Sequence, residues 1–302
     1  MFKGCGTALI TPFAADGSLD EHTLRRLVSR QVDDGIHFLV PGGTTGESPT
    51  LTKEEHLRLV EITLEEAEGR VPVVAGCGGY NTANNVSLAA DLDALGVQGL
   101  LSVTPYYNKP TPEGLYRHYE ALANATDLPI VVYNVPGRTC CNITPDLLCR
   151  LAGIANVVAV KEASGNIGQM ARVCQCVPEG FAVLSGDDSV TLPLMSLGGV
   201  GVVSVVSNEV PGAMARLCDR ALAGNFAGAR ALHRRYLSLM DVNFCETSPG
   251  PVKVAMEMMG LLDEARWRLP MTRPSAASCD LVRQALDGLG LVVQRAALAA
   301  VG

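Results

Sequence analysis

Short apolar runs alternate with amphipathic segments along most of this chain, and this alternation restricts the folds that it can adopt. The apolar runs have the length and the β-branched composition of strands that are buried on both faces. The segments between them carry apolar residues three and four positions apart, as at Leu57, Val60 and Leu64, which predicts helices with one buried face. Eight strands are expected, at residues 6–10, 38–40, 71–75, 99–103, 130–133, 157–160, 182–184 and 201–205.

A strand followed by a helix, repeated many times, predicts parallel strands joined by right-handed crossovers. Eight such units form a closed (β/α)8 TIM barrel, so the fold class is α/β, with the barrel at residues 1–225. A C-terminal helical extension follows at 226–302, with helices at 226–239, 252–259 and 276–289. A doubly wound sheet is the competing fold. Its dinucleotide-binding form needs a Gly-rich turn after the first strand, where this chain has Thr11-Pro12-Phe13, so that form is excluded.

The charge and the hydropathy of the chain narrow the choice of partners. The formal net charge is −7 and no long Lys/Arg run occurs, which argues against nucleic acid as a ligand. The chain has no apolar run as long as a membrane span, and its first residues do not resemble a signal peptide. We therefore expect a cytoplasmic protein that does not bind membranes.

Ten cysteines raise the question of disulfides and metal sites. Several of them, such as Cys5, Cys77, Cys149 and Cys218, fall within predicted strands and helices, where a cytoplasmic protein uses cysteine as a small buried hydrophobe. The pairs Cys140-Cys141 and Cys174/Cys176 do not have the spacing of a zinc site. We expect no metal, and buried thiols without a catalytic role at Cys140 and Cys141.

Lys161 closes the apolar run 157–160, so its ammonium group is predicted to lie at the end of a buried strand. An isolated charge in apolar surroundings is costly, and burial lowers the pKa of a lysine. A neutral amine attacks a carbonyl group and forms a Schiff base. The alternative is a structural lysine that reaches solvent or pairs with Glu162.

Other polar residues follow the predicted strands at the end of a barrel where active sites lie. The loop 42–48 contains Thr44 and Thr45 among glycines, which favours a backbone nest for a carboxylate. Tyr133 precedes Lys161 by 161 − 133 = 28 residues, one strand–helix repeat, so the two should lie level on neighbouring strands. A phenol there can exchange protons with a carbinolamine. Arg138 can hold a second carboxylate with its planar guanidinium group.

Five motifs together resemble those of the dihydrodipicolinate synthase family, a relative of N-acetylneuraminate lyase among lysine-dependent, pyruvate-handling barrels. The resemblance covers roughly residues 3–290. The motifs are Gly43-Thr44-Thr45-Gly46-Glu47-Ser48, Pro105-Tyr106-Tyr107-Asn108-Lys109-Pro110, Tyr133-Asn134-Val135-Pro136-Gly137-Arg138-Thr139, Val160-Lys161-Glu162-Ala163-Ser164 and Ser185-Gly186-Asp187-Asp188.

The resemblance implies a reaction and a set of roles. Pyruvate forms a Schiff base on Lys161, and the resulting enamine condenses with L-aspartate 4-semialdehyde to give 4-hydroxy-tetrahydrodipicolinate, a precursor of lysine and diaminopimelate. No metal or organic cofactor is implied, and the expected assembly is a homotetramer, a dimer of dimers. The implied roles are proton transfer for Tyr133, a relay for Thr44 and for Tyr107 from a neighbouring subunit, carboxylate binding for Thr45 and Arg138, and pocket lining for Gly186 and Val203.

Many members of the family are inhibited by lysine at a second site between subunits. The matching positions here are Ser48, Pro49, Lys53, His56, Tyr80, Asn84 and Tyr106. Lysine-sensitive relatives usually carry asparagine at the position of Tyr80 and a carboxylate at that of Asn84. Because the ammonium group of a lysine ligand would lack that carboxylate and meet the cation of Lys53, we expect weak or absent feedback.

Two other functions remain open from the sequence. Another Schiff-base aldolase of the same superfamily would cleave a 2-keto-3-deoxy sugar acid or sialic acid, and Arg138 favours the synthase because its aldehyde substrate carries a carboxylate. A catalytically silent barrel that binds a keto acid as a sensor is the second. The intact set of Lys161, Tyr133, Thr44, Tyr107 and Arg138 argues against it, since a sensor needs no proton relay.

Overall fold

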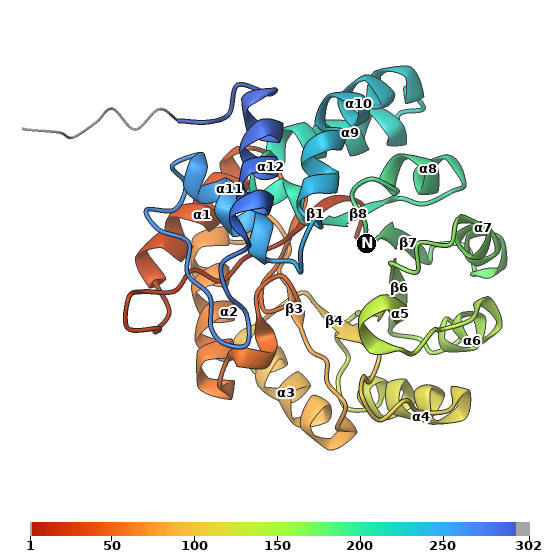
Figure 1. The fold of residues 1–302 in the computed structure, drawn as a ribbon. Coiled ribbons are helices and arrows are strands. Elements are labelled where there is room, and N and C mark those ends of the chain that lie inside the picture. Colours follow the sequence, from red (N-terminus) through yellow and green to blue (C-terminus); the bar gives the residue numbers. More distant parts are fainter. Residues whose placement is uncertain (1, 294–302) are drawn as a thin grey trace, which may run out of the picture.

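Eight parallel strands form a barrel in the computed structural model, which describes residues 2–293. Their order is β2-β1-β8-β7-β6-β5-β4-β3. A parallel bridge between Leu39 and Val73 and the bond from the Leu39 amide to the Pro72 carbonyl (2.9 Å) join the two end strands. The predicted barrel is confirmed, with its helices outside the strands (Figure 1). The strands are β1 (Gly4–Ala8), β2 (Phe38–Val40), β3 (Val74–Gly76), β4 (Gly99–Val103), β5 (Ile130–Asn134), β6 (Val157–Glu162), β7 (Ala182–Ser185) and β8 (Gly201–Ser204).

Four predicted strand boundaries are wrong by two or three residues: both ends of β1, the start of β3 and the end of β6. Strand β1 begins at Gly4, whose amide donates to the Val200 carbonyl (2.8 Å), and not at residue 6. Strand β3 begins at Val74 and not at residue 71. Pro72 has no amide to donate to a neighbouring strand, so regular pairing starts after it.

Helices follow the strands, and their first residues match local signals in the sequence. Thr52 caps α2 through the Glu55 amide, and Glu55 caps back in a capping box. Helices α4 and α6 begin at Pro112 and Pro145, positions where proline loses no hydrogen bond. The helices of the barrel are α1 (Glu21–Asp33), α2 (Lys53–Ala67), α3 (Thr82–Leu95), α4 (Pro112–Ala123), α5 (Pro136–Thr139), α6 (Pro145–Leu151), α7 (Ile167–Cys176), α8 (Thr191–Ser196) and α9 (Pro211–Leu222), with short 3-10 turns at Ser48–Thr50 and Val206–Asn208.

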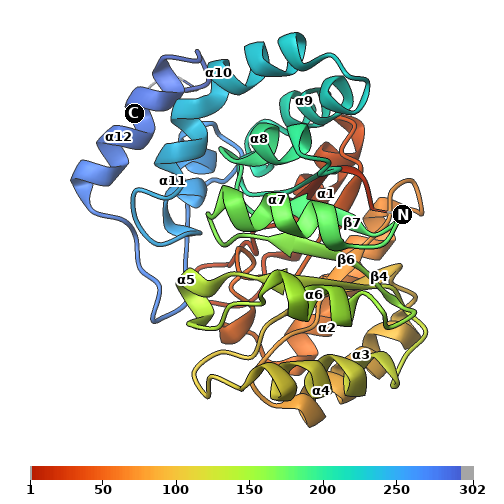
Figure 2. The same ribbon diagram turned by 90° about the vertical axis from the view of Figure 1, so that its right-hand side faces the viewer.

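The C-terminal extension consists of α10 (Phe226–Val242), α11 (Gly250–Met258) and α12 (Ala276–Asp287). It packs on the barrel without a separate core, because Val252 and Met256 of α11 join one buried cluster with Ile10 and Leu27. Figure 2 shows α11 and α12 on the same side of the barrel as α5. The boundary at residue 225 stays a prediction, and residues 294–302 of the predicted extension lie outside the described residues. Within residues 2–293 no helix is long and apolar enough to cross a membrane.

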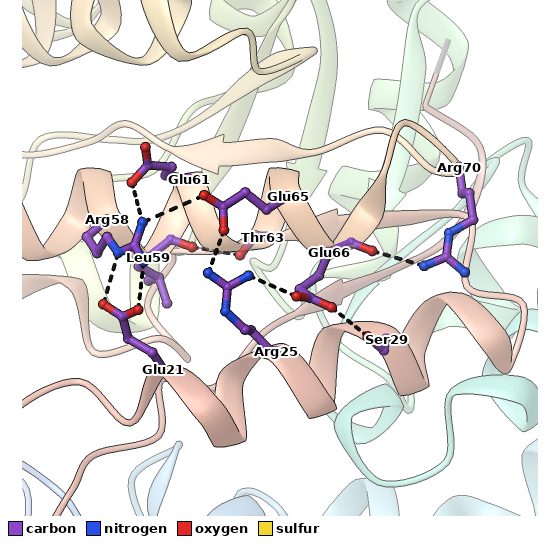
Figure 3. Close-up of polar contacts among 10 residues, drawn as sticks. All are labelled: Glu21, Arg25, Ser29, Arg58, Leu59, Glu61, Thr63, Glu65, Glu66 and Arg70. Carbon is purple, nitrogen blue, oxygen red and sulfur yellow. Dashed lines mark hydrogen bonds and ion pairs between the residues drawn. The ribbon is translucent and has the colours of Figure 1, made fainter.

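Ion pairs join the outer faces of α1 and α2 (Figure 3). Arg25 donates to Glu66 (2.8 Å) and to Glu65 (2.5 Å), while Arg58 donates to Glu21 (2.7 Å). These charges are partly exposed, so salt screens their attraction. The network adds polar contacts between two helices whose apolar faces already pack on the barrel.

The expectation for the cysteines is wrong in two respects. Cys149 of α6 and Cys176 of α7 form a disulfide, with Cα atoms 6.2 Å apart. Their separation of 27 residues is about one strand–helix repeat, which brings the C-terminal ends of neighbouring helices together. Of the adjacent pair, Cys140 is exposed and Cys141 is buried. Cys140 follows the last residue of α5 and has a left-handed conformation (φ 53°).

Glu209 lies in the segment between β8 and α9 and carries a buried carboxyl group. It is fully buried, one oxygen accepts from the Asn243 side-chain amide (2.7 Å), and the other has no hydrogen-bond partner among the described residues. Burial, with a contribution from nearby Asp188, raises the pKa of Glu209 well above its ordinary value. The folded chain therefore holds a proton that the unfolded chain releases, so this group lowers stability as the pH rises above the ordinary range of a glutamate.

We expect Glu209→Gln to raise the melting temperature by about 2–4 °C at pH 8, the size that about 1 kcal/mol produces in a large domain. The gain should shrink at pH 5, where Glu209 itself is closer to its protonated form. Thermal unfolding at both pH values measures it, with the exposed Glu179→Gln as the control. A gain of equal size at both pH values would contradict the assignment.

Candidate active site

Lys161 and Tyr133 are paired residues of adjacent strands. In the register of β5 and β6, Tyr133 is the Cα partner of Lys161, as the spacing of 28 residues predicts. The Lys161 Nζ lies 4.1 Å from the centroid of the Tyr133 ring. Lys161 is 4% exposed and Tyr133 6%, so the amine and the phenol share a site that is largely shielded from water.

Glu162 does not neutralise Lys161. Successive side chains of a strand point to opposite faces, and Glu162 accepts instead from the Asn134 side-chain amide (3.0 Å) and from the Ser164 backbone amide (2.8 Å). No carboxylate within residues 2–293 forms an ion pair with Lys161 that meets the usual distance of 4.0 Å. The structural alternative, a lysine that reaches solvent or pairs with Glu162, is therefore wrong.

Gly186 follows β7 and makes room for the Lys161 side chain. A Cβ atom at Gly186 would lie 3.1 Å from Lys161 Cε and 2.7 Å from the Ala163 Cβ. Any larger residue would displace the stem that carries the amine. Val203, on β8, is 1% exposed and belongs with Tyr133 and Leu184 to the cluster inside the barrel.

The loop after β2 folds into a tight turn that carries Thr44 and Thr45. The Glu47 amide donates to the Thr44 carbonyl (3.1 Å), and the Gly46 amide donates to the Gly43 carbonyl (3.1 Å). Thr11, three residues after the end of β1, donates to the Gly46 carbonyl (2.6 Å). Thr45 is 5% exposed, and the turn lies at the end of the barrel where β5 and β6 present Tyr133 and Lys161.

Glu47, at the end of this turn, forms a buried ion pair with Lys253 of α11. Both side chains are 1% exposed. The Lys253 Nζ also donates to the Arg266 carbonyl (2.8 Å). Burial lowers the pKa of Lys253 to about 8, against the attraction of Glu47 that raises it, so the ammonium group remains protonated at neutral pH.

Arg138 lies on α5, the four-residue helix after β5, and its guanidinium is exposed. Its Nη2 donates to the Ser248 carbonyl (3.2 Å) in the loop before α11. The C-terminal extension thus contacts both the Thr44–Glu47 turn and Arg138. No carboxylate of the described chain forms an ion pair with Arg138, which leaves its charge available to a ligand.

A cavity of about 680 Å³ extends from these residues toward the outside of the barrel. Its wall includes Tyr133, whose ring contacts the Lys161 amine, together with Thr44 and Arg138. The described residues that line it include the cations Lys53 and Arg138 but no aspartate or glutamate. The cavity is therefore suited to anionic ligands, as two carboxylate-bearing substrates would be.

Comparison with known proteins shows the family of this chain. The sequence profile of the Dihydrodipicolinate synthetase family matches residues 1–288. The chain belongs to this family. A 4-hydroxy-tetrahydrodipicolinate synthase of Koribacter versatilis is 52% identical over 270 residues, covering 89% of this chain and 90% of that protein.

Solved structures of the family have the same fold. Dihydrodipicolinate synthase from Aquifex aeolicus superposes with a TM-score of 0.94 at 43% identity, covering 97% of this chain and 100% of that one. The enzyme from Acinetobacter baumannii, described as chloride-inhibited and complexed with pyruvate, gives a TM-score of 0.94 at 39% identity and covers 97% and 100% of the two chains.

The outer part of the cavity contains the residues expected at the family's second site. His56 donates from Nε2 to the Gly76 carbonyl (2.9 Å), and burial lowers its pKa, so His56 is neutral at pH 7. Tyr80 stacks edge-on against Tyr106, with ring centroids 5.4 Å apart. The lining residues from this set are Ser48, Pro49, Lys53, His56, Tyr80, Asn84 and Tyr106.

Lys53 forms an ion pair that was not predicted from the sequence. Its Nζ lies 2.5 Å from a carboxylate oxygen of Asp91 on α3. This ion pair partly neutralises the charge that was expected to repel a lysine ligand. Asn84 is exposed at the cavity wall and brings no charge.

Tyr107 does not enter the cavity of its own chain. It is 90% exposed and has a left-handed backbone conformation (φ 67°), which is unusual for an aromatic residue. Lys161, Thr45, Gly186 and Val203 are also absent from the lining residues of the cavity, so Lys161 adjoins the cavity through its contact with the Tyr133 ring. Gly186 and Val203 adjoin Lys161 and Tyr133 inside the barrel, whereas Tyr107 points away from them.

Sequence reasoning overlooked Lys253 and left Glu47 without a role. The available signal was the same one that identified Lys161, a lysine within an apolar run, here Pro251-Val252-Lys253-Val254-Ala255. Among residues 2–293 there is no group of three or more His, Cys, Asp and Glu side chains placed to hold a metal ion.

Proposed function

We propose that this chain condenses pyruvate with L-aspartate 4-semialdehyde to 4-hydroxy-tetrahydrodipicolinate, in the biosynthesis of lysine and diaminopimelate, through a Schiff base on Lys161. The observation that carries the proposal is the buried Lys161 amine, unpaired with any described carboxylate, 4.1 Å from the Tyr133 ring centroid. Membership of the family supports the same reaction.

The first half of the reaction builds the nucleophile. The Lys161 amine attacks the keto carbon of pyruvate, and the carbinolamine loses water to become an iminium ion. The Tyr133 phenol donates a proton to the carbinolamine hydroxyl group, which leaves as water. The resulting phenolate can accept a proton in a later step. The iminium ion then loses a proton from the pyruvate methyl group and becomes the enamine. The face of the Tyr133 ring stabilises the positive charge of the iminium ion.

The second half joins the two substrates. The enamine carbon attacks the aldehyde carbon of the semialdehyde and restores an iminium ion. The amino group of the semialdehyde then attacks the iminium carbon, closes the ring and releases the Lys161 amine. The reaction consumes no redox equivalent and needs only the lysine, so the proposal includes no separate cofactor.

The two carboxylates are assigned to two sites. Thr45 and the amides of its turn bind the pyruvate carboxylate, and Thr44 begins a proton relay from Tyr133. Arg138 binds the carboxylate of the semialdehyde, because its guanidinium is exposed at the cavity and forms no described ion pair. Gly186 and Val203 shape the space around Lys161. The local positive charge offsets a net charge of −7 that would repel both substrates.

The rival functions are less well supported. A sugar acid or sialic acid lyase would bind a polyhydroxylated substrate through hydroxyl and amide groups. This cavity also presents the guanidinium of Arg138, which suits an aldehyde that carries a carboxylate. A silent keto-acid sensor would not need an amine that is buried and unpaired at a cost in stability. The location that we propose for the enzyme is the cytoplasm.

Lys161→Ala should abolish turnover, and Arg138→Ala should reduce kcat/KM for the semialdehyde by about 10- to 100-fold, the effect of losing one charge-assisted contact. Pyruvate capture should survive in Arg138→Ala. Borohydride reduction with pyruvate and peptide mass mapping measure capture, and a coupled assay compares the semialdehyde with sugar-derived aldehydes. Near-normal activity of Lys161→Ala, or a preference for a sugar-derived aldehyde, would refute the function.

We further propose a homotetramer, a dimer of dimers, in which Tyr107 completes the relay of a neighbouring subunit. The support is the 90% exposure of the Tyr107 side chain on a left-handed backbone turn. A phenol that the protein's own cavity does not use, held outward at a conformational cost, is suited to a partner's site.

Subunit mixing tests this role. Tyr107→Phe should lower kcat by about 10²-fold, the usual size of a lost proton-transfer step. Co-expression with Lys161→Ala should restore activity, because a mixed pair contains one site with Lys161 from one subunit and Tyr107 from the other. An activity equal to the mean of the two separate variants would contradict the shared site.

We also propose that lysine inhibits this enzyme weakly. The cavity residues Ser48, His56, Tyr80, Asn84 and Tyr106 offer hydroxyl, imidazole and amide groups, but no lining residue is acidic. The ammonium group of a lysine ligand therefore has no carboxylate to pair with.

Half-inhibition should require lysine well above the millimolar range in the wild type, and Asn84→Glu should lower the required concentration by about tenfold, as one new charged contact would. Steady-state assays with added lysine measure both. L-norleucine, which lacks the side-chain ammonium group of lysine but keeps the α-ammonium group, should gain nothing from Asn84→Glu. Half-inhibition of the wild type at sub-millimolar lysine would disprove the proposal.

A further inference from the structure

The buried lysine of α11 has no part in the reaction described above. Lys253 is fully buried although it carries a charge, and an unpaired ammonium group there would be very costly. Three contacts compensate for its burial: the ion pair with Glu47, the bond to the Arg266 carbonyl, and the face of the Phe13 ring, whose centroid is 4.5 Å from Nζ. Three separate parts of the chain thus converge on one ammonium group.

Glu47 has an unfavourable backbone conformation at this point. Its φ is +54°, in the left-handed region that residues other than glycine rarely occupy. Such a conformation persists only where the surroundings hold it. The Glu47 side chain is held at both oxygens, one by Lys253 and the other by the Arg268 backbone amide (3.3 Å).

The conformation of Glu47 determines the direction of the two threonines before it. The turn is closed by the bond from the Glu47 amide to the Thr44 carbonyl and is anchored on its other side by Thr11. A rotation of Glu47 would therefore shift Thr44 and Thr45 together. A shift of about 1 Å in a substrate-binding group is enough to reduce catalysis strongly.

We infer that Lys253 is a positioning residue for the pyruvate-binding turn, acting through its buried ion pair with Glu47. The C-terminal extension is in this sense part of the active site, although it supplies no group that touches the reacting atoms. The inference rests on the proposed function, because it assigns the pyruvate carboxylate to the Thr44–Thr45 turn.

A purely structural role is the alternative, and a double variant separates the two. Lys253→Met alone leaves the Glu47 carboxylate buried without its cation, which destabilises the fold whatever else the pair does. Glu47→Gln combined with Lys253→Met removes both charges, and replacing a buried pair by neutral groups is often neutral for stability. A structural pair predicts that the double variant recovers both its melting temperature and its activity.

We expect the double variant to regain a melting temperature near that of the wild type while its KM for pyruvate stays at least tenfold higher. The rate at which the borohydride-trapped pyruvate adduct forms on Lys161 should fall in parallel. KM for the semialdehyde should change less than twofold. The matched control neutralises an exposed ion pair between α4 and α6, by Glu113→Gln with Arg150→Gln. In the wild type, Arg150 Nη2 lies 3.1 Å from Glu113 Oε2. Wild-type pyruvate kinetics in the folded double variant would overturn the inference.

A second variant covers the case in which the double variant does not fold. Glu47→Asp keeps the charge but shortens the side chain by one methylene group, so the turn must move for the pair to form. It should raise KM for pyruvate several-fold, and an unchanged KM would count against the positioning role. If the wild type itself forms no adduct with pyruvate, the proposed function fails, whereas an adduct that forms equally well in all variants removes only the role of Lys253.

Discussion

The parallel pairing of β5 with β6 determines where the chemistry of this protein takes place. Backbone hydrogen bonds fix Tyr133 opposite Lys161, and the alternation of side chains sends Glu162 to the other face. The amine is thereby separated from the nearest acidic residue in the sequence and brought against a phenol. A shift of one residue in this register would exchange Lys161 with Glu162 and eliminate the site.

The two buried lysines show how the surroundings of one side-chain type separate reactivity from structure. Lys161 lies beside a cavity with an aromatic face and no described carboxylate, so it is available to a carbonyl carbon. Lys253 is enclosed with a carboxylate and a carbonyl group that accept its N–H groups, so it has no free electron pair with which to attack a carbonyl carbon. Burying Lys161 without an ion-pair partner lowers the stability of the fold, as is usual for a site that is arranged to bind a ligand.

The barrel and its central pair could be predicted because both depend on a repeat in the sequence. Apolar runs located the strands, and one repeat of 28 residues placed Tyr133 level with Lys161. The same reasoning applied to Cys149 and Cys176 would have suggested their contact, but their place in predicted helices favoured buried thiols. Lys253 could not be placed this way, because α11 lies outside the repeat and meets Glu47 only through tertiary packing. The start of β3 after Pro72 and the left-handed turn at Glu47 likewise depend on backbone details that apolar periodicity does not encode.

Arg138 lies on α5, a four-residue helix inserted between β5 and α6, and not on a barrel strand. The insertion leaves the pairing of β5 with β6 intact, so the segment that we propose to contact the second substrate can change while the amine and the phenol stay in place. In evolutionary terms, substrate preference and nucleophile chemistry are encoded in separable pieces of the chain. New aldehyde specificities are therefore accessible by altering a few residues around α5, without rebuilding the barrel that holds the reactive lysine.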